Sequence, residues 1–234
     1  MLNALPQIDT YVPVDISEQF LHENADRLAQ QYETLNIVPV VADFMTPFAV
    51  PVDVSSGPLV GFFPGSTLGN LDPIQAVELL KMARGFPNTH GFILGIDLVK
   101  DRQRLVEAYD DAQGVTAAFN LNLLTRLNCE LGADFDVSAF AHEARWNEEL
   151  ARIEMHLVAT CAQTVTIDGT VFEFTKGESI HTENSHKYTK ESITRIVGEA
   201  GWTLSVFVTD ERDDFAVCIL SCLLYTSPSP RDRG

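Results

Sequence analysis

Acidic side chains follow several of the expected strands at the point where each strand ends. Asp15 closes the apolar run YVPVD, Asp43 with Phe44 closes NIVPVVADF, and Asp97 closes GFILGID. In open α/β sheets, ligands bind beyond the carboxyl ends of the strands. A strand-end carboxylate can accept both hydrogen bonds of a ribose diol, and an Asp followed by an aromatic ring can bind and cover an adenine. These residues predict a nucleoside cofactor, although a single strand-end Asp is equally suited to forming a turn.

The stretch GFFPGSTLGN, residues 61–70, places glycines and hydroxyl residues directly after an apolar run. It lacks both the GxGxxG spacing of a dinucleotide loop and the GK[ST] ending of a P-loop. It also contains no Lys or Arg to bind a diphosphate. A cofactor without phosphate, such as S-adenosylmethionine, therefore fits these residues better than NAD does.

Composition excludes several classes of partner. A net charge of −17 over 234 residues argues against nucleic acid or an anionic membrane as the ligand. No run of 18 or more apolar residues predicts a membrane span, and the N-terminus lacks the basic start of a signal peptide. The 4 cysteines contain no CxxC pair. We therefore expect a cytoplasmic protein with reduced thiols and no structural zinc.

Strand and helix patterns alternate through the first part of the chain. Apolar runs at 11–16, 36–44, 58–65 and 91–99 predict strands. Helical patterns at 17–33 and 74–86 lie between them, the first capped by Ser17 and the second by Asp72 followed by Pro73. This spacing is typical of βαβ units and predicts a parallel, doubly wound sheet.

The pattern changes in the second part of the chain. Residues 100–131 read as mostly helical, and strands are expected at 153–160, 163–167 and 170–174, with a hairpin turn at Asp168-Gly169. An amphipathic helix at 189–202 then precedes an antiparallel hairpin formed by 203–210 and 214–221. A parallel sheet closed by an antiparallel hairpin is typical of class I, Rossmann-like methyltransferases. The segment between reads as an inserted α+β module.

Linked motifs occur in order between Tyr11 and Ser221: FFPGSTLGN, IDLVKD, YDDAQGVTAAFNLNLLTRLN, IEMHL and SIHTENSHKY. In these motifs and their spacing, the chain resembles the histidine-specific N-alpha-methyltransferase family of ergothioneine biosynthesis. The resemblance implies a methyltransferase domain with a separate substrate-binding domain. It also implies S-adenosylmethionine as the cofactor and L-histidine as the substrate, trimethylated on its α-amine to give hercynine.

The resemblance assigns cofactor contacts to residues of the first part of the chain. Asp15 would bind the ribose, and Asp43 with Phe44 would contact the adenine. Gly65 is expected on the substrate side of the site instead, because a glycine there would let the backbone of the glycine-rich stretch approach the ligands closely.

The resemblance also assigns the substrate contacts. Asn70 would hold the amine and carboxylate end of the amino acid, and Tyr109 its carboxylate. Glu183 and Ser185 would bind the imidazole, and Met155 would line that pocket.

The expected domain limits follow from the same comparison of motifs. Residues 1–100 and 190–221 would form a partial methyltransferase domain without its first βα unit, and 101–189 the substrate-binding insertion. Residues 222–234 are expected to be a non-native tail, because CLLYTSPSPRD resembles an in-frame translation of a sequencing adapter. A glycine-rich loop of the ELGSG type and substrate-contacting tyrosines are expected ahead of Tyr11 and are absent.

Alternatives remain at this point. The chain could act on another amino acid with the same fold, or it could be a non-catalytic remnant that binds the amino acid without the cofactor. His181, Glu183 and His186 do not match the HExxH pattern of a zinc helix, so no metal is expected. His142 and His156 are expected to be structural. A monomer is expected.

Overall fold

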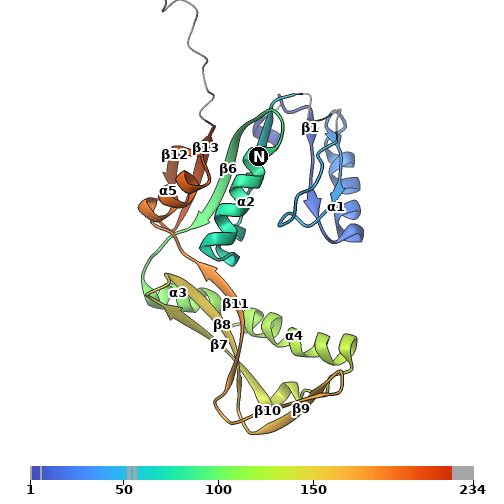
Figure 1. The fold of residues 1–234 in the computed structure, drawn as a ribbon, viewed down its shortest axis with the longest axis vertical. Coiled ribbons are helices and arrows are strands. Elements are labelled where there is room, and N and C mark those ends of the chain that lie inside the picture. The colour runs from blue at the N-terminus through green and yellow to red at the C-terminus, as the bar shows by residue number, and fades with distance from the viewer. Residues whose placement is uncertain (1, 6, 52–53, 55–56, 223–234) are drawn as a thin grey trace, which may run out of the picture.

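The computed structural model describes residues 2–5, 7–51, 54 and 57–222, and the expected tail lies outside this part except for Cys222. The described residues form two lobes (Figure 1). The upper lobe contains residues up to 99 and from 188 onward, and the lower lobe contains residues 100–187. Among the described residues, no helix has the length and apolarity needed to cross a bilayer.

A four-stranded mixed sheet forms the centre of the upper lobe. Its strand order is β12, β13, β6, β5, in which β5 and β6 are parallel and the other neighbours are antiparallel. The strands are β5 Leu59–Phe63, β6 Thr89–Asp97, β12 Thr203–Thr209 and β13 Phe215–Ser221. The pairing of β12 with β13 confirms the antiparallel hairpin expected at the end of the sheet.

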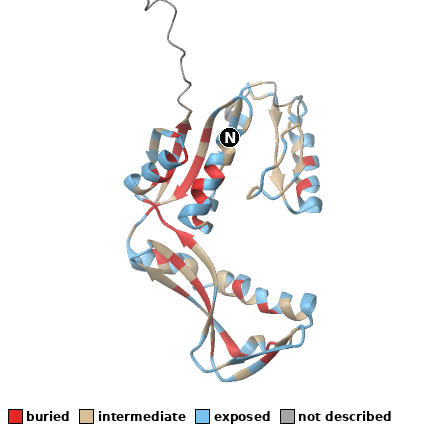
Figure 2. Cartoon of the chain, in the orientation of Figure 1, coloured by how far each residue is buried: buried red, intermediate tan, exposed pale blue. Residues whose placement is uncertain are grey.

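Helices α2 (Pro73–Gly85) and α5 (Lys190–Glu199) contribute to one core with β6 and β13. Figure 2 shows the buried residues along these elements. The helix α2 begins as the sequence predicts, since the side chain of Asp72 accepts from the Gln75 amide at 2.8 Å. The side chain of Gln75 accepts in turn from the Asp72 amide, which completes a capping box. The opposite face of the sheet exposes apolar side chains of Val60, Phe62, Val206, Val208, Val217 and Ile219.

A separate small unit is formed by the N-terminal strands and helix α1 (Glu18–Gln31), after a short 3₁₀ turn η1 (Leu2–Ala4). Its strands form two parallel pairs: β1 Thr10–Tyr11 with β3 Asn36–Ile37, and β2 Val14–Asp15 with β4 Val40–Val41. The uninterrupted strands expected at 11–16 and 36–44 are therefore broken. Pro13 and Pro39 lie at the breaks, where a residue without an N–H cannot extend the ladder.

The parallel pairs of this unit are not joined to β5 by strand pairing in the described part of the chain. The sequence predicts that the segments 11–16 and 36–44 belong to a parallel, doubly wound sheet; in the described residues they pair in parallel with each other but not with β5. The unit contacts the central core instead through the side chains of Phe44 and Met45. Contact between side chains, rather than backbone pairing, holds it there.

The lower lobe is an antiparallel sheet packed against helices α3 (Arg102–Tyr109) and α4 (Val115–Leu131). The sheet order is β11, β8, β7, and a further hairpin is formed by β9 and β10. The strands are β7 Phe140–Asn147, β8 Arg152–Ala159, β9 Gln163–Ile167, β10 Thr170–Phe174 and β11 Ser179–His186, with a 3₁₀ turn η3 at Val137–Ala139. The expected turn at Asp168-Gly169 is present, with φ of 46° and 76°.

The lobes are joined where two passages of the chain run side by side. The Tyr188 amide donates to the Asp97 carbonyl, and the Val99 amide donates to the Tyr188 carbonyl, both at 3.0 Å. These two bonds bring the end of β6 next to the residues that follow β11, so the two strand ends lie at one place between the lobes. We call this place the junction.

Candidate active site

The turn after β5 is hydrogen-bonded to the end of β6. Gly65 and Ser66 both adopt left-handed backbone conformations, with φ of 73° and 59°. The Ser66 amide donates to the Gly95 carbonyl at 3.1 Å, and the Asp97 amide donates to Ser66 Oγ at 2.9 Å. A non-glycine residue at positive φ costs about 1–3 kcal/mol and is concentrated at functional sites. These bonds place the following 3₁₀ turn, η2 (Thr67–Asn70), at the junction.

Asn70 and Glu183 are hydrogen-bonded although they lie 113 residues apart in the chain. Asn70 Nδ2 donates to Glu183 Oε1 at 2.8 Å. Glu183 is half-buried on β11, and this burial raises the pKa of its carboxyl above the usual value. The preceding Gly69 packs against β11 so closely that a Cβ would lie 2.8 Å from the His186 carbonyl oxygen. The structure therefore brings together two residues that the sequence assigned to the substrate.

Tyr109 and Ser185 form the second pair, with 2.8 Å between their hydroxyl oxygens. Tyr109 is the last residue of α3, and Ser185 is buried on β11. His142 Nε2 lies 2.7 Å from the Tyr109 carbonyl, and Asn120 Nδ2 lies 2.9 Å from His142 Nδ1. Because a carbonyl only accepts, Nε2 carries the proton and Nδ1 accepts from Asn120. His142 thus fixes the end of α3, as expected for a structural histidine.

Met155 lies across from Glu183 in the β8–β11 ladder and is almost fully buried. The register between these strands shifts between His181 and Glu183, so one extra residue is accommodated there. Such a bulge changes the direction in which the following side chains point. Glu183 and Ser185 are alternate residues after the bulge and so lie on the same face of β11.

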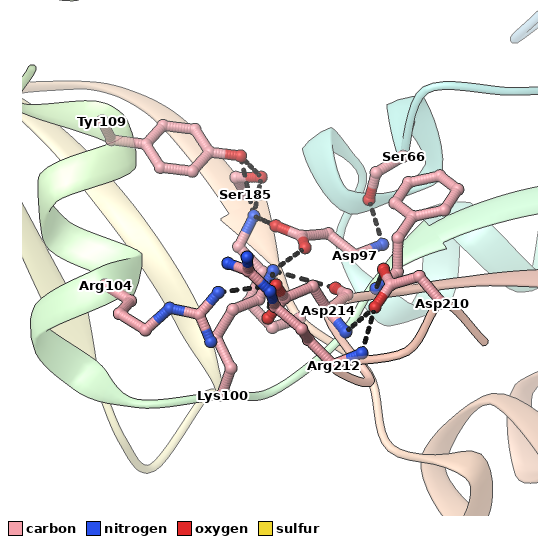
Figure 3. Close-up of polar contacts among 11 residues, drawn as sticks. Ser66, Asp97, Lys100, Arg104, Tyr109, Ser185, Asp210, Arg212 and Asp214 are labelled. Atoms are coloured by element: carbon pink, nitrogen blue, oxygen red, sulfur yellow. Dashed lines mark hydrogen bonds and ion pairs between the residues drawn. The ribbon is translucent and has the colours of Figure 1, made fainter.

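Lys187 is a residue of this group that the sequence analysis missed. Its side chain is fully buried, and its Nζ lies 2.8 Å from Asp97 Oδ2, 2.7 Å from Tyr109 OH and 2.9 Å from Ser185 Oγ. Figure 3 shows Tyr109, Ser185 and Asp97 converging on one point of the junction. The available signal was the alternation Glu183, Ser185, Lys187 along TENSHK.

A chain of ion pairs extends from Asp97 across the junction (Figure 3). Lys100 Nζ contacts Asp97 Oδ1 at 2.6 Å and also donates to the Asp214 carbonyl at 2.8 Å. Arg104 at the start of α3 pairs with Asp214 at 2.5 Å. The hydrogen bond from Arg104 lowers the pKa of the Asp214 carboxyl. The strand-end Asp97 is thus bound by two lysines, Lys100 and Lys187.

The residues expected to bind the cofactor lie in the N-terminal unit. Asp15 Oδ1 accepts from the Ser17 amide and Asp43 Oδ1 from the Met45 amide, each at 2.8 Å. Both carboxylates therefore cap local turns, but each retains a second oxygen. The Phe44 ring meets Phe63 at the end of β5 edge-on, 5.5 Å between centroids. In the described residues, no hydrogen bond connects either Asp with the Asn70–Glu183 pair.

A different cluster has the side chains of a possible metal site. Ligand atoms of Glu154, His156 and His181 all lie within 4.8 Å of one another, on the β8 and β11 strands. Arg152 already donates to Glu154 Oε1 at 2.8 and 2.6 Å. Burial raises the pKa of Glu154, but its hydrogen bonds from Arg152, Asn147 and His156 outweigh burial and lower it to about 2. The negative charge of Glu154 is thus compensated by the positive charge of Arg152, and we assign no metal to the cluster.

The candidate site is a convergence of side chains at the junction. Two surface hollows lie in the described part of the chain away from the two polar pairs, one between α5 and β12 and one between α3 and β7. Chemically, the junction offers the carboxylate and amide of one pair and the two hydroxyls of the other, and the hydroxyls contact a buried ammonium. This set can hold a small polar molecule that has both hydrogen-bond donors and acceptors.

Comparison with known families identifies one match over most of the chain. A family described as "Histidine-specific methyltransferase, SAM-dependent" matches residues 1–222. The histidine N-alpha-methyltransferases of Mycolicibacterium smegmatis and Mycobacterium tuberculosis are each 39% identical over 89% of this chain. The chain spans 65% of the length of each of these relatives. The N-methyltransferase fsqC of Aspergillus fumigatus is 34% identical over 58% of this chain and 37% of its own length.

Two solved structures with a similar fold are methyltransferases. An S-adenosylmethionine-dependent methyltransferase from Clostridium acetobutylicum has a TM-score of 0.52 at 11% identity, over 94% of this chain and 78% of its own. The CcbJ methyltransferase of Streptomyces caelestis has a TM-score of 0.50 at 14% identity, over 90% of this chain and 74% of its own. These similarities confirm the methyltransferase fold class that the sequence predicts.

Proposed function

Because the chain belongs to the family of histidine-specific, S-adenosylmethionine-dependent methyltransferases, we propose that it transfers methyl groups from S-adenosylmethionine to the α-amine of L-histidine. Three transfers would give hercynine, the trimethylated betaine of ergothioneine biosynthesis. A protein of fission yeast named "Ergothioneine biosynthesis protein 1" is 26% identical over 60% of this chain, which supports the same pathway. This chain spans 65% of the length of the two mycobacterial relatives, so the proposal concerns the activity of a whole protein of that family.

The observation that carries the proposal is the convergence of two polar pairs at the junction. Asn70 and Glu183 form one pair, and Tyr109 and Ser185 form the other. Glu183 accepts from one ring N–H of the imidazole, and Ser185 bonds the other ring nitrogen. Asn70 and Tyr109 hold the amino-acid end, and Met155 lines the pocket. A site with buried polar groups rejects ligands that leave those groups unpaired, which gives selectivity for histidine.

Positioning is sufficient to explain the chemistry. Methyl transfer from a sulfonium is an in-line displacement, and alignment of the reactants can contribute about 7–11 kcal/mol. The attacking α-amine must be neutral, and its proton can leave to water. The site therefore needs no dedicated base. Asp15, Asp43 and Phe44 are assigned to the ribose and adenine of S-adenosylmethionine, and Gly65 to the backbone that lies close to the ligands.

The lobes take different roles in this proposal. Residues 1–100 and 190–221 form the methyltransferase domain, and 101–189 the substrate-binding insertion. The chain acts as a monomer in the cytoplasm, with a small molecule as its partner and neither nucleic acid nor membrane.

Two rival functions are favoured by specific observations. The relative fsqC is named an N-methyltransferase without mention of histidine, so another amine substrate on the same fold is the first rival. The carboxylates of Asp15 and Asp43 already cap their own turns, so an amino-acid-binding protein without the cofactor is the second.

Titration calorimetry of the chain with L-histidine and with S-adenosylmethionine separates these functions, with L-phenylalanine and L-glutamine as matched amino acids. We expect binding of both ligands and a clear preference for histidine. Equal binding of the other amino acids would support the first rival, and binding of histidine alone the second.

Mass spectrometry of the products then tests the reaction. Histidine incubated with the protein and S-adenosylmethionine should gain up to three methyl groups on its α-nitrogen. If the reading frame extends upstream of Met1, the assay uses the extended protein as well. Failure of both proteins to methylate histidine would overturn the proposed reaction.

A further inference from the structure

Lys187 has the environment of a residue that organises other side chains. Its side chain is fully buried between the lobes. Its partners come from three elements: Asp97 from β6, Tyr109 from α3 and Ser185 from β11. The ammonium also lies 4.5 Å from the centroid of the Tyr109 ring. A buried lysine is rare unless it is paired, so this arrangement has a specific cause.

The hydrogen-bonding capacity of Lys187 is fully used inside the protein. An ammonium has three N–H donors and no acceptor. Oxygens of Asp97, Tyr109 and Ser185 take these donors at 2.8, 2.7 and 2.9 Å. No donor remains for a ligand, so Lys187 acts on a ligand only through Tyr109 and Ser185.

The protons of the two hydroxyls can then be counted. Each hydroxyl has one hydrogen to donate, and each oxygen already accepts from Lys187. The bond between Tyr109 and Ser185 uses one of their two hydrogens, whichever residue donates it. When Tyr109 donates to Ser185, the remaining hydrogen belongs to Ser185 and is directed away from the ammonium, so the pair presents a hydrogen-bond donor to the imidazole. In this arrangement Tyr109 offers its oxygen, and not a hydrogen, to the amino-acid end of the ligand.

We infer that Lys187 is a positioning residue that fixes the Tyr109–Ser185 pair as a hydrogen-bond donor and so selects the protonation state of the bound imidazole ring. The inference rests on the proposed function, because it assumes that histidine occupies the junction. Glu183, which lies two residues before Ser185 on the same face of β11, supplies the matching acceptor. A neutral imidazole has one N–H and one bare nitrogen, so it satisfies both sides of this clamp.

The geometry also disfavours the alternative ring states. An imidazolium has an N–H on both nitrogens, and one of them would face the hydroxyl pair next to the Lys187 ammonium. The flipped neutral tautomer would point its bare nitrogen at the Glu183 carboxylate. Each arrangement leaves polar groups unpaired in a buried place, which is costly. The bound ring is thus neutral, with its proton on the nitrogen that faces Glu183.

The variant Lys187→Met tests the role of the ammonium, because methionine keeps the length of the side chain and removes its donors. Histidine affinity, measured by calorimetry, should fall at least about tenfold, as expected when hydrogen bonds to a charged group are lost. Lys81→Met is the control, because Lys81 lies on α2 away from the junction and pairs with Glu78 at 2.9 Å, where both side chains are exposed. Its affinity for histidine should change less than about threefold.

A double-mutant cycle separates positioning from general damage to the fold. If Lys187 acts through the hydroxyl of Ser185, then in a Ser185→Ala background Lys187→Met should cost clearly less than it does alone. The conservative Lys187→Arg variant should recover part of the affinity. Equal costs in both backgrounds would indicate a structural role only and would overturn the inference.

The unmutated protein provides a test that does not depend on folding of a variant. Ring-labelled ¹⁵N-histidine bound to the chain should show by NMR one protonated and one bare ring nitrogen. Two protonated nitrogens in the bound state would overturn the inference. Failure of the unmutated chain to bind histidine would instead overturn the proposed function. Histidine binding that is unchanged in Lys187→Met would overturn the inference and leave the proposed function standing.

Discussion

At the scale of single residues, Glu183 is subject to opposing demands of stability and recognition. Its carboxyl is half-buried, and burial raises its pKa, so deprotonation is disfavoured in the folded chain. A carboxyl whose pKa is higher in the folded than in the unfolded chain stabilises the fold at pH values below its unfolded pKa. This stabilisation is lost as the pH rises through the folded-state pKa. At neutral pH the charge of Glu183 therefore costs stability. In the proposed function, this cost is offset by the hydrogen bond that Glu183 accepts from the ring N–H of the ligand.

The variant Glu183→Gln separates these effects. Glutamine retains an oxygen that accepts from Asn70 but has no charge. Histidine affinity should fall at least about tenfold, while the free energy of unfolding in urea stays equal or rises. Glu173→Gln, on the exposed side of β10, is the control and should alter neither quantity. Unchanged histidine affinity in Glu183→Gln would contradict the role assigned to the carboxylate.

At the scale of elements, the start of α2 positions η2 for its contact with β11. The Asp72 side chain accepts from the Gln75 amide as the cap of α2, directly after η2 ends at Asn70. Asp72→Ala should lower the free energy of unfolding by about 0.5–2 kcal/mol, because a cap is lost. Ser17→Ala is a matched control, since Ser17 occupies the cap position of α1 without a side-chain bond. A similar loss in both variants would show that capping is not the cause.

The contact of η2 with β11 depends on a glycine. A Cβ on Gly69 would lie 2.8 Å from the His186 carbonyl oxygen and 3.3 Å from its amide nitrogen. Gly69→Ala should therefore destabilise the chain by about 1–3 kcal/mol and also weaken histidine binding, because Asn70 moves away from Glu183. Gly85→Ala, at the end of α2, meets no atom within 4 Å and should leave both unchanged or slightly improved. Thermal melts and calorimetry measure the two effects.

The sequence predicts the elements that have a clear apolar period and misses those that do not. α2, α5 and the β12–β13 hairpin have strong caps or alternating apolar residues, and all three are present as predicted. β7 and β11 were missed because their sequences, FAHEARWN and SIHTENSH, are rich in polar residues. The polar residues of β11 include Glu183 and Ser185, so the strand with the weakest apolar signal carries much of the candidate site.

The candidate site was predicted unevenly for a similar reason. Asn70, Tyr109, Glu183 and Ser185 were assigned through resemblance, and the structure brings them together in pairs. Lys187 follows in the same motif, but a lysine is usually exposed, and nothing in the sequence reveals that it is buried against Asp97. Long-range pairing of this kind depends on how the lobes meet.

At the scale of the whole molecule, charge is concentrated where the lobes meet. The net charge is −17, yet the junction gathers Lys100, Arg104 and Lys187 around Asp97 and Asp214. These paired charges connect β6, α3, β11 and the turn before β13. The lobes are thus connected by ion pairs, by the Asp97–Tyr188–Val99 backbone bonds and by the contact of η2 with β11. Among the described residues, no buried apolar cluster contains residues of both lobes.

Buried histidines make the stability of the whole chain sensitive to mild acid. Burial lowers the pKa of both His156 and His186 from the usual 6.5, so both are neutral in the folded state. The unfolded chain then binds more protons than the folded chain below that value. Their contribution is therefore present above the unfolded pKa and is lost as the pH falls toward the folded value. His186 Nε2 is buried and has no partner among the described residues, so protonation there would bury an unpaired donor.

We therefore expect the free energy of unfolding in urea to fall between about pH 7.5 and about pH 5.5 at constant ionic strength. His186→Gln should reduce this fall, because glutamine does not titrate. His22→Gln, on the exposed side of α1, should leave it unchanged. Relief of repulsion among the excess carboxylates acts in the opposite direction, but these groups take up protons mainly below about pH 5. A stability that rises between the two pH values would show that charge repulsion, and not histidine burial, governs the chain in this range.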